Sequence, residues 1–392
     1  MSSDIIEFVD APSEEVATPG EVRYSDVVLH ATDWTTETVV GQLRRGNIIL
    51  NPRFQRRDAW DRQRKSQFIE SLILGLPIPQ IVLAELKEKR GSFIVLDGKQ
   101  RLLSLLQFWG LGDGDNNSYP LSGLEVRENL LRKKFYDLES DPEFADDYNA
   151  LLNQPIRTVV IKNWPDVAFL HLVFLRLNTG SVKLSPQELR QALFPGNFTD
   201  FVDDRSVQST GIQKLLGLRR PDYRMRDVEL LARFLAFHFF LGDYRSRMKA
   251  FLDNTFERLN GDWETKFEEI EAASDAFDGA LVSLMELFGD SLARKPSSRQ
   301  INRAILDALV FYSIDKRIQM AMKSHKESVL ENYQTLFEDH GFVSAIERDT
   351  ASVFNTATRL RKWGEALQRS TGLEFEIPEL IDDRIVFNGF WR

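Results

Sequence analysis

Near the start of the chain, apolar residues recur with the period of a helix. Residues 36–43 are predicted to form a short helix, because Val39, Val40 and Leu43 fall on one face. A turn and a short predicted strand, residues 48–50, follow it. These blocks are too short to hold a core alone, so they must pack against later elements.

A longer helix is predicted from Arg62 to Leu74, with apolar residues at positions 68, 69, 72 and 73 on its buried face. Asp61 precedes the first turn and is a suitable N-cap, because its carboxylate can accept a bond from a free backbone N–H. Gly75 ends the helix, and Pro77 prevents its continuation.

The next blocks have the pattern of strands. Residues 80–86 and 92–96 flank a charged turn and are predicted to form a hairpin. A helix is expected from Lys99 to Trp109, and residues 156–161 form a further β-branched strand. The segment 143–149 is interpreted as acidic surface.

From residue 166 onward the pattern is helical almost to the end. Ser185, Pro186 and Glu188 begin one helix with a serine cap, a proline at the first position and an acid in the first turn. Residues 200–375 read as a helical bundle. We therefore predict an α+β protein with an acidic disordered tail (1–25), a mixed domain (26–200) and an α-helical domain (201–392).

The amino-acid composition excludes several classes of function. Hydrophobic residues make up 43% of the chain and charged residues 28%, which is typical of a globular protein, and the absence of cysteine excludes disulfides and thiolate zinc sites. The net charge of −9 argues against a protein that coats nucleic acid. No membrane span or signal sequence is evident, so a cytoplasmic protein is expected.

The strongest candidate site is the sequence Asp97-Gly98-Lys99-Gln100-Arg101. An apolar strand ends in a glycine turn and a helix begins at once, so free N–H groups and the positive end of the helix dipole point at the turn. Lys99 and Arg101 add full charges that suit an anion. Asp97 fits if it holds a divalent metal, a ribose hydroxyl or the arginine. The plainer interpretation is a strand-to-helix turn with a solvated basic first turn.

The densest positive cluster covers residues 53–65, with six basic and two acidic side chains. An aromatic ring, an amide and guanidinium groups side by side can stack on a base and hold a phosphate, although a bare charge run is more often a solvated helix start. The side chains in question are Arg53, Phe54, Gln55, Arg56 and Arg57.

A third candidate lies where a predicted helix carrying Arg176 ends at Asn178-Thr179-Gly180. Such loops present N–H groups and hydroxyls to phosphates, but an ordinary turn between helices with Gly180 as its cap has the same pattern. Glu188 and Arg190 follow, and they suit buried ion pairs between lobes as well as a site. There is no P-loop motif, no metal-ligand spacing among the five histidines and no His-Asn-His nuclease constellation.

Taken in order and spacing, these motifs resemble the amino-terminal domain family of GmrSD-type modification-dependent restriction endonucleases. The resemblance covers roughly residues 30–260 and implies a ParB/sulfiredoxin-like nucleotide-binding fold. Two positions depart from the family pattern. Lys99 stands where the family usually has glutamine, and Phe54 stands where tyrosine is usual.

The resemblance implies a domain that binds a nucleoside triphosphate, most often GTP, with Mg²⁺. It implies a sensor-regulatory subunit of an anti-phage system that recognises modified DNA and acts with a separately encoded HNH-type nuclease. It leaves open whether the NTP is hydrolysed and whether the protein forms an oligomer. Two alternatives remain, which are a non-catalytic DNA- or protein-binding module and a metal-dependent DNA nuclease. A single candidate carboxylate gives the nuclease little support.

The resemblance also assigns roles to residues. Asp97 and Arg101 are the candidate catalytic residues, and Asp97 is the candidate metal ligand. The candidates for nucleotide and phosphate binding are Gln55, Arg56, Gly98, Lys99, Gln100, Arg101, Arg176, Asn178 and Thr179. The candidates for DNA or base contact are Arg53, Phe54 and Arg57.

Overall fold

The computed structural model describes residues 8–9, 27–50, 58–111, 118–177, 185–296 and 298–391. The chain divides into two compact units. The sheet unit comprises Ala17–Leu193 and Tyr223–Met225. The helical unit comprises Met1–Val16, Phe194–Asp222 and Arg226–Arg392. The α+β class is confirmed, with a small mixed sheet in the first unit and a helical carboxyl-terminal part.

The sheet unit is built on a five-stranded sheet with the order β2-β6-β4-β5-β3. Its strands are β2 (Val28–Thr35), β3 (Ile48–Ile49), β4 (Ile81–Glu85), β5 (Phe93–Asp97) and β6 (Pro155–Lys162). The antiparallel β4–β5 pair confirms the predicted hairpin, whereas β6 runs parallel to β4 and β3 runs parallel to β5. The long edge strand β2, antiparallel to β6, was not predicted, because its exposed sequence lacks a clear alternation.

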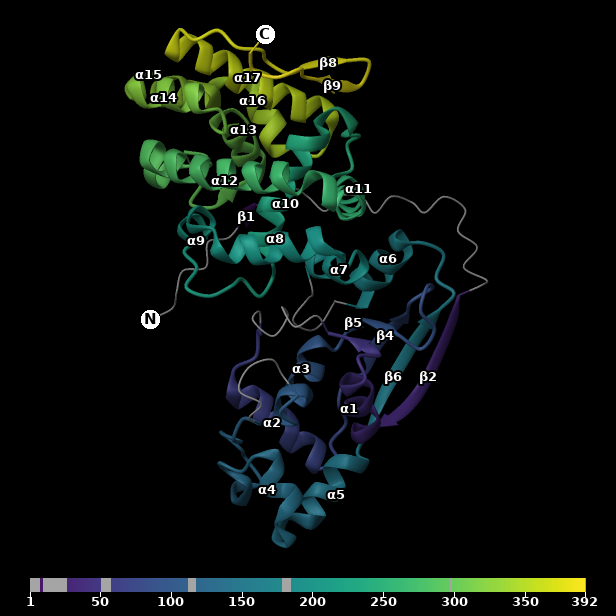
Figure 1. The fold of residues 1–392 in the computed structure, drawn as a ribbon. Helices are drawn as coiled ribbons and strands as arrows, with labels where there is room; N and C mark the ends of the chain where they lie inside the picture. Colours follow the sequence, from purple (N-terminus) through teal and green to yellow (C-terminus); the bar gives the residue numbers. More distant parts are fainter. Residues whose placement is uncertain are drawn as a thin grey trace. The chain divides into compact units, whose positions relative to one another are not determined.

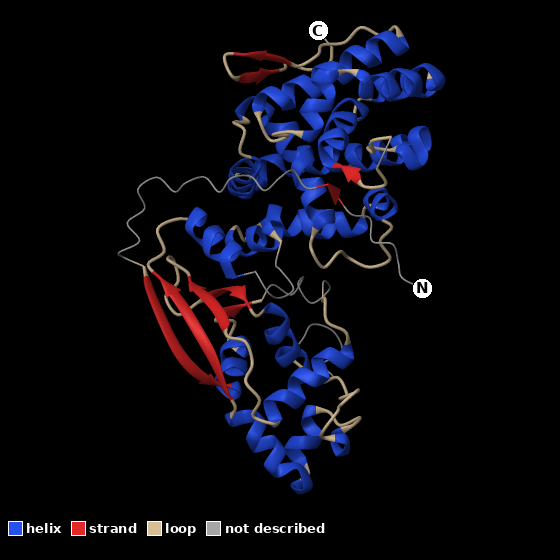
Figure 2. Cartoon of the chain, turned by 180° about the vertical axis from the view of Figure 1, so that it is seen from behind, coloured by secondary structure: helices blue, strands red, loops and turns tan. Residues whose placement is uncertain are grey.

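Helices cover both faces of this sheet (Figures 1 and 2). They are α1 (Thr36–Arg44), α2 (Arg62–Ile73), α3 (Lys99–Phe108), α4 (Phe135–Ser140), α5 (Ala145–Asn153), α6 (Val167–Leu177) and α7 (Pro186–Leu193), with short 3-10 turns at Glu128–Leu130 and Pro142–Phe144. One core joins α1, α2, α3 and α5 to the sheet, and a second core joins α6 and α7 to its other face. Strands β4 and β5 are therefore buried on both sides, which is why they read as continuous apolar runs.

The predicted helix signals act as expected. The Asp61 side chain accepts a 2.8 Å bond from the Arg64 N–H at the start of α2, and Gly75 has a positive φ just after its end. The interpretation of residues 143–149 as acidic surface was wrong in part. Phe144 is buried, and Asp147 is buried on α5, where it pairs with Arg127.

The helical unit confirms the predicted bundle. Its helices are α8 (Asn197–Gln208), α9 (Thr210–Leu216), α10 (Arg226–Phe240), α11 (Met248–Gly261), α12 (Trp263–Phe288), α13 (Arg303–Ser313), α14 (Lys316–Ser324), α15 (Lys326–Thr335), α16 (His340–Glu347) and α17 (Val353–Thr371), with 3-10 turns at Leu241–Asp243, Gly289–Ser291 and Leu336–Glu338. A hairpin of β8 (Glu379–Ile381) and β9 (Arg384–Val386) follows α17, and its two turn residues both have positive φ.

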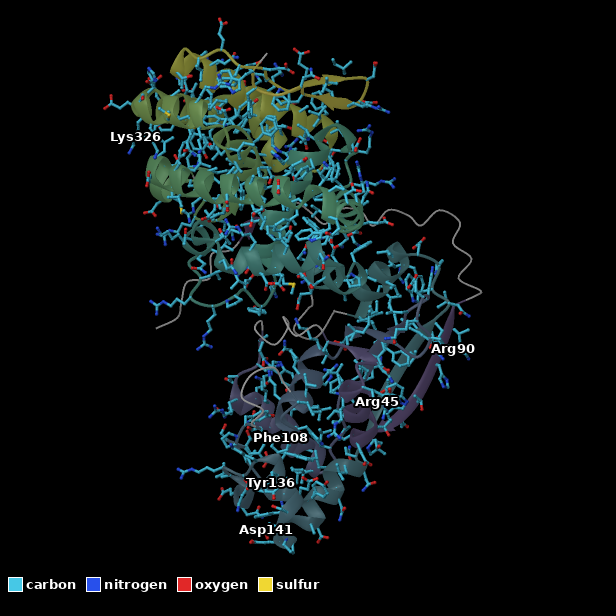
Figure 3. The ribbon with its side chains drawn as sticks, in the orientation of Figure 1. Arg45, Arg90, Phe108, Tyr136, Asp141 and Lys326 are labelled. Carbon is cyan, nitrogen blue, oxygen red and sulfur yellow. The ribbon has the colours of Figure 1, made fainter. Side chains whose placement is uncertain are left out.

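The remaining strands join distant parts of the chain. β1 (Phe8–Val9) pairs in parallel with β7 (Ile301–Asn302), and the rest of the predicted tail, residues 1–7 and 10–25, lies outside the described residues. Phe108 at the end of α3 is buried and Tyr136 on α4 is exposed; Figure 3 labels both residues. Among the helices that the structure describes, none has the length and apolar character needed to cross a bilayer.

Candidate functional site

The turn between β5 and α3 is built around Gly98. Its φ of 97° lies in the left-handed region, which favours glycine, and a Cβ at this position would meet Ile81 Cγ1 at 3.1 Å and an Arg101 nitrogen at 3.3 Å. No side chain caps the amino terminus of α3 within the described residues. The first backbone N–H groups of a helix have no intrahelical acceptors, so this turn is suited to receive an anion.

Asp97 and Arg101 face each other across this turn. An Arg101 guanidinium nitrogen lies 3.0 Å from Asp97 Oδ2 and also donates to the carbonyl oxygen of Gln80 at 3.0 Å. Arg101 is only 6% exposed, and its Nε has no hydrogen-bond partner among the described residues. A buried guanidinium with one free donor, beside a helix amino terminus, is suited to a further oxygen ligand.

Lys99 is held by an acid from the opposite face of the sheet. Its Nζ lies 2.5 Å from Glu188 Oε1, and both side chains are buried. The other oxygen of Glu188 accepts a 2.7 Å bond from the Ser185 N–H, while the Ser185 hydroxyl accepts from the Glu188 N–H at 3.1 Å. This reciprocal pattern is the predicted capping box of α7. It fixes Glu188, and Glu188 fixes Lys99.

The partner of Lys99 was not predicted from the sequence. The sequence allows Glu188 to be a site residue or part of an ion pair between lobes, and the structure places its ion pair within the sheet unit. The available signal was the departure from the family pattern, because a buried lysine in place of a glutamine requires a nearby acid.

Gln100 binds the backbone of the segment that follows the predicted contact residues 53–57. Its Oε1 accepts a 3.3 Å bond from the Ala59 N–H, and Gln107 on the same helix donates to Asp58 at 3.1 Å. Residues 58 and 59 therefore lie along α3. The predicted contact residues just before them, Arg53, Phe54, Gln55, Arg56 and Arg57, lie outside the described residues.

The third predicted motif is described only in part. Arg176 is exposed in the last turn of α6, and no interaction joins it to the Asp97–Arg101 turn among those that the structure describes. Asn178 and Thr179 lie outside the described residues. On α7, Gln187 and Arg190 are buried and hydrogen-bonded to each other at 2.5 Å.

The donors at this turn, a helix amino terminus without a side-chain cap among the described residues and a buried guanidinium, suit an anionic oxygen ligand. Among the residues described, no group of three or more histidine, aspartate or glutamate side chains could hold a metal ion. Mg²⁺ usually takes one or two protein carboxylates and completes its shell with water and substrate phosphates. Asp97, at the end of β5, could supply one such oxygen, and it could equally continue to orient Arg101.

Residues 37–195 match the family model described as the N-terminal domain of the GmrSD restriction endonuclease. No curated protein matches the chain, and no solved structure matches it either. The matched range contains the β5–α3 turn, the Lys99–Glu188 pair and the segments on both sides of the basic cluster.

Proposed function

We propose that this protein, whose residues 37–195 match the N-terminal domain family of the GmrSD restriction endonuclease, binds and hydrolyses a nucleoside triphosphate as the sensor subunit of a restriction system. GTP with Mg²⁺ is the proposed ligand. The observation that carries the proposal is the buried Arg101, whose free Nε lies beside the glycine turn at the amino terminus of α3.

In this proposal each residue of the turn has a separate task. Gly98 adopts the left-handed turn conformation, and its lack of a Cβ leaves room for Ile81 and for the Arg101 guanidinium. Arg101 donates to a phosphate through Nε while its other contacts, to Asp97 and Gln80, hold the guanidinium in place. Lys99 stabilises the turn through its ion pair with Glu188, because its ammonium group already binds that carboxylate.

Bound Mg²⁺ would neutralise charge that develops on the phosphates during hydrolysis. Asp97 is the proposed protein ligand of that metal. The proposal also keeps Gln55 and Arg56 as phosphate-binding residues, Arg53, Phe54 and Arg57 as contacts to modified DNA, and Arg176, Asn178 and Thr179 as residues that close the pocket. A separate HNH-type subunit is the proposed source of DNA cleavage.

The proposal is tested by calorimetric titration with GTP, ATP and CTP in the presence of Mg²⁺. Two glycines provide a matched pair of variants. Gly98 and Gly91 both have positive φ, but a Cβ at Gly91 would meet nothing within 4 Å, whereas a Cβ at Gly98 would meet Ile81 and Arg101. Alanine imposes similar backbone strain at both positions and obstructs only the turn at Gly98.

We expect saturable binding by the wild type, with GTP preferred. Gly91→Ala should retain that affinity, and Gly98→Ala should weaken it by at least tenfold, a change of about 1.4 kcal/mol in binding free energy. Circular dichroism shows whether both variants are folded. Binding that Gly98→Ala and Gly91→Ala weaken equally would contradict the location of the site, and no binding to any nucleotide would contradict the function.

A further inference from the structure

The helical unit contains a cavity of about 380 Å³ that the nucleotide proposal does not use. Its wall is formed by α10, α12, α13, α17 and the chain that follows β9. Most of the lining is aromatic or aliphatic, including Phe234, Phe237, Leu306, Val310, Phe311 and Phe390. The volume lies in the range of small-molecule sites, and such sites combine apolar walls with a few convergent polar groups.

Two such polar groups come from α17. Thr356 and Arg359 line the cavity, and each is only 1% exposed. Thr356 Oγ1 and Arg359 Nε have no hydrogen-bond partner among the described residues. Residues three apart on a helix lie on the same face, so these two groups are neighbours. Leaving such groups unpaired in an apolar wall costs free energy, which a bound ligand can recover.

The charges around Arg359 favour an anionic partner. Its Nη1 donates to the carbonyl oxygen of Thr350 at 2.7 Å, and its Nη2 lies 4.0 Å from the Asp307 carboxylate. Asp307 is already bound more closely by Arg233, at 3.3 Å and 2.5 Å. The two guanidinium groups therefore share one carboxylate, and the interaction of Arg359 with it is the weaker of the two.

The protonation states agree with this arrangement. Burial lowers the pKa of Arg359, and nearby Arg233 lowers it further, although Asp307 opposes both effects. Burial also lowers the pKa of His238, which lines the same cavity, so its imidazole is largely neutral at pH 7. The lining thus presents the Arg359 guanidinium, the Asp307 carboxylate that Arg233 binds more closely, one unpaired hydroxyl and an apolar body.

We propose that this cavity binds a small amphipathic molecule with an aromatic or branched apolar body and a single acidic oxygen group, such as a carboxylate or a sulfonate. The acidic oxygens accept hydrogen bonds from Arg359 Nε and Thr356 Oγ1. The apolar body packs against the rings of α10 and α13. All lining residues belong to the helical unit, so the proposal does not depend on the nucleotide site.

The test uses two fluorescent probes that share an anilinonaphthalene body. Anilinonaphthalene sulfonate carries the acidic group, and phenylnaphthylamine lacks it. Both are titrated into the full chain, with fluorescence enhancement as the readout. The variants are Thr356→Val, which removes the hydroxyl with little change of shape, Arg359→Gln, which removes the charge, and Leu306→Phe, which fills the cavity. Arg361→Gln, on the same helix but exposed, is the control.

We expect the sulfonate to bind saturably, at one site per chain, and more tightly than phenylnaphthylamine. Thr356→Val should weaken the sulfonate by about threefold to tenfold, as expected for the loss of one hydrogen bond, and should leave phenylnaphthylamine unchanged. Leu306→Phe should weaken both probes, and Arg361→Gln should weaken neither.

Non-saturable binding, equal affinity for the two probes, or sulfonate binding unaffected by both Thr356→Val and Leu306→Phe would each overturn the proposal. Arg359→Gln removes a buried charge that also holds Thr350, and it is interpreted only if its circular dichroism and thermal melting match those of the wild type. If Arg359→Gln does not fold, Thr356→Val still decides the test.

Discussion

Lys99 connects the β5–α3 turn to a helix on the opposite face of the sheet. Its ammonium group is buried at the first turn of α3 and reaches Glu188 on α7. Glu188 in turn is oriented by the capping box with Ser185. The pair therefore joins two helices that pack on different faces of the sheet, directly at the end of β5.

We predict that Lys99→Gln, which restores the residue usual in the family, destabilises this protein. Removing one partner leaves a buried carboxylate without its counter-charge, and breaking a buried pair in this way costs about 3–5 kcal/mol. The free energy of unfolding in urea measures the loss. The double variant Lys99→Gln/Glu188→Gln should recover part of it, because glutamine also serves in a capping box.

A double variant no more stable than Lys99→Gln alone would show that the ion pair does not account for the loss. The coupling between the two substitutions isolates the contribution of the pair, provided that neither single variant forms new contacts.

At the residue scale, the sequence predicts only what lies close along the chain. The contact between Asp97 and Arg101 is one helical turn long and was expected as one of several roles for Asp97. Glu188 lies 89 positions from Lys99, and only packing of α7 on the sheet brings the two together. The orientation of the Arg101 guanidinium likewise depends on the Gln80 carbonyl, which lies 21 positions away and accepts a bond from a nitrogen of the same group.

At the scale of elements, local signals set the helix ends correctly. Asp61 caps α2, and Ser185 and Glu188 form the box that begins α7, because capping uses residues within one turn. Strand β2 and the β8–β9 hairpin were missed. Both have exposed residues where a half-buried strand would alternate, so they lack the hydrophobic period that marks strands.

Glu70 on α2 holds the loop that leads away from the sheet. Its carboxylate accepts hydrogen bonds from three successive backbone N–H groups, those of Glu125, Val126 and Arg127. Burial by itself would raise the pKa of Glu70, but these bonds to the ionised form outweigh it and hold the pKa below its ordinary value. The ionised carboxylate thus stabilises the fold.

We predict that Glu70→Gln lowers the free energy of unfolding at pH 7 by about 1–3 kcal/mol, since an amide is a weaker acceptor for these donors. The folded-state pKa is depressed, so the contribution of Glu70 is fully present above pH 4.5 and is lost as the pH falls through the folded pKa. Urea unfolding of both proteins at pH 7 and pH 4 measures the difference. A deficit that stays constant or grows at the lower pH would contradict this assignment.

At the scale of the whole molecule, the sequence predicts the candidate site of the sheet unit but not the cavity of the helical unit. The family match, residues 37–195, covers most of the sheet unit, whose motifs are short and ordered along the chain. The cavity in the helical unit draws its lining from residues between Leu230 and Phe390. No local pattern marks such a set, because the helical stretches read as ordinary core helices and the residues of the chain after β9 lie far from them in the sequence.

Nucleotide binding at Arg101 is tested most directly by a calorimetric titration of Mg²⁺ and GTP into the wild type, Arg101→Lys and Arg101→Ala. We predict one site per chain in the wild type. Both variants should bind about 10- to 100-fold more weakly, because a charged hydrogen bond contributes about 1.5–3 kcal/mol and lysine cannot reproduce the guanidinium fork. Circular dichroism identifies the folded variants. A folded Arg101→Ala protein with wild-type affinity would contradict the account.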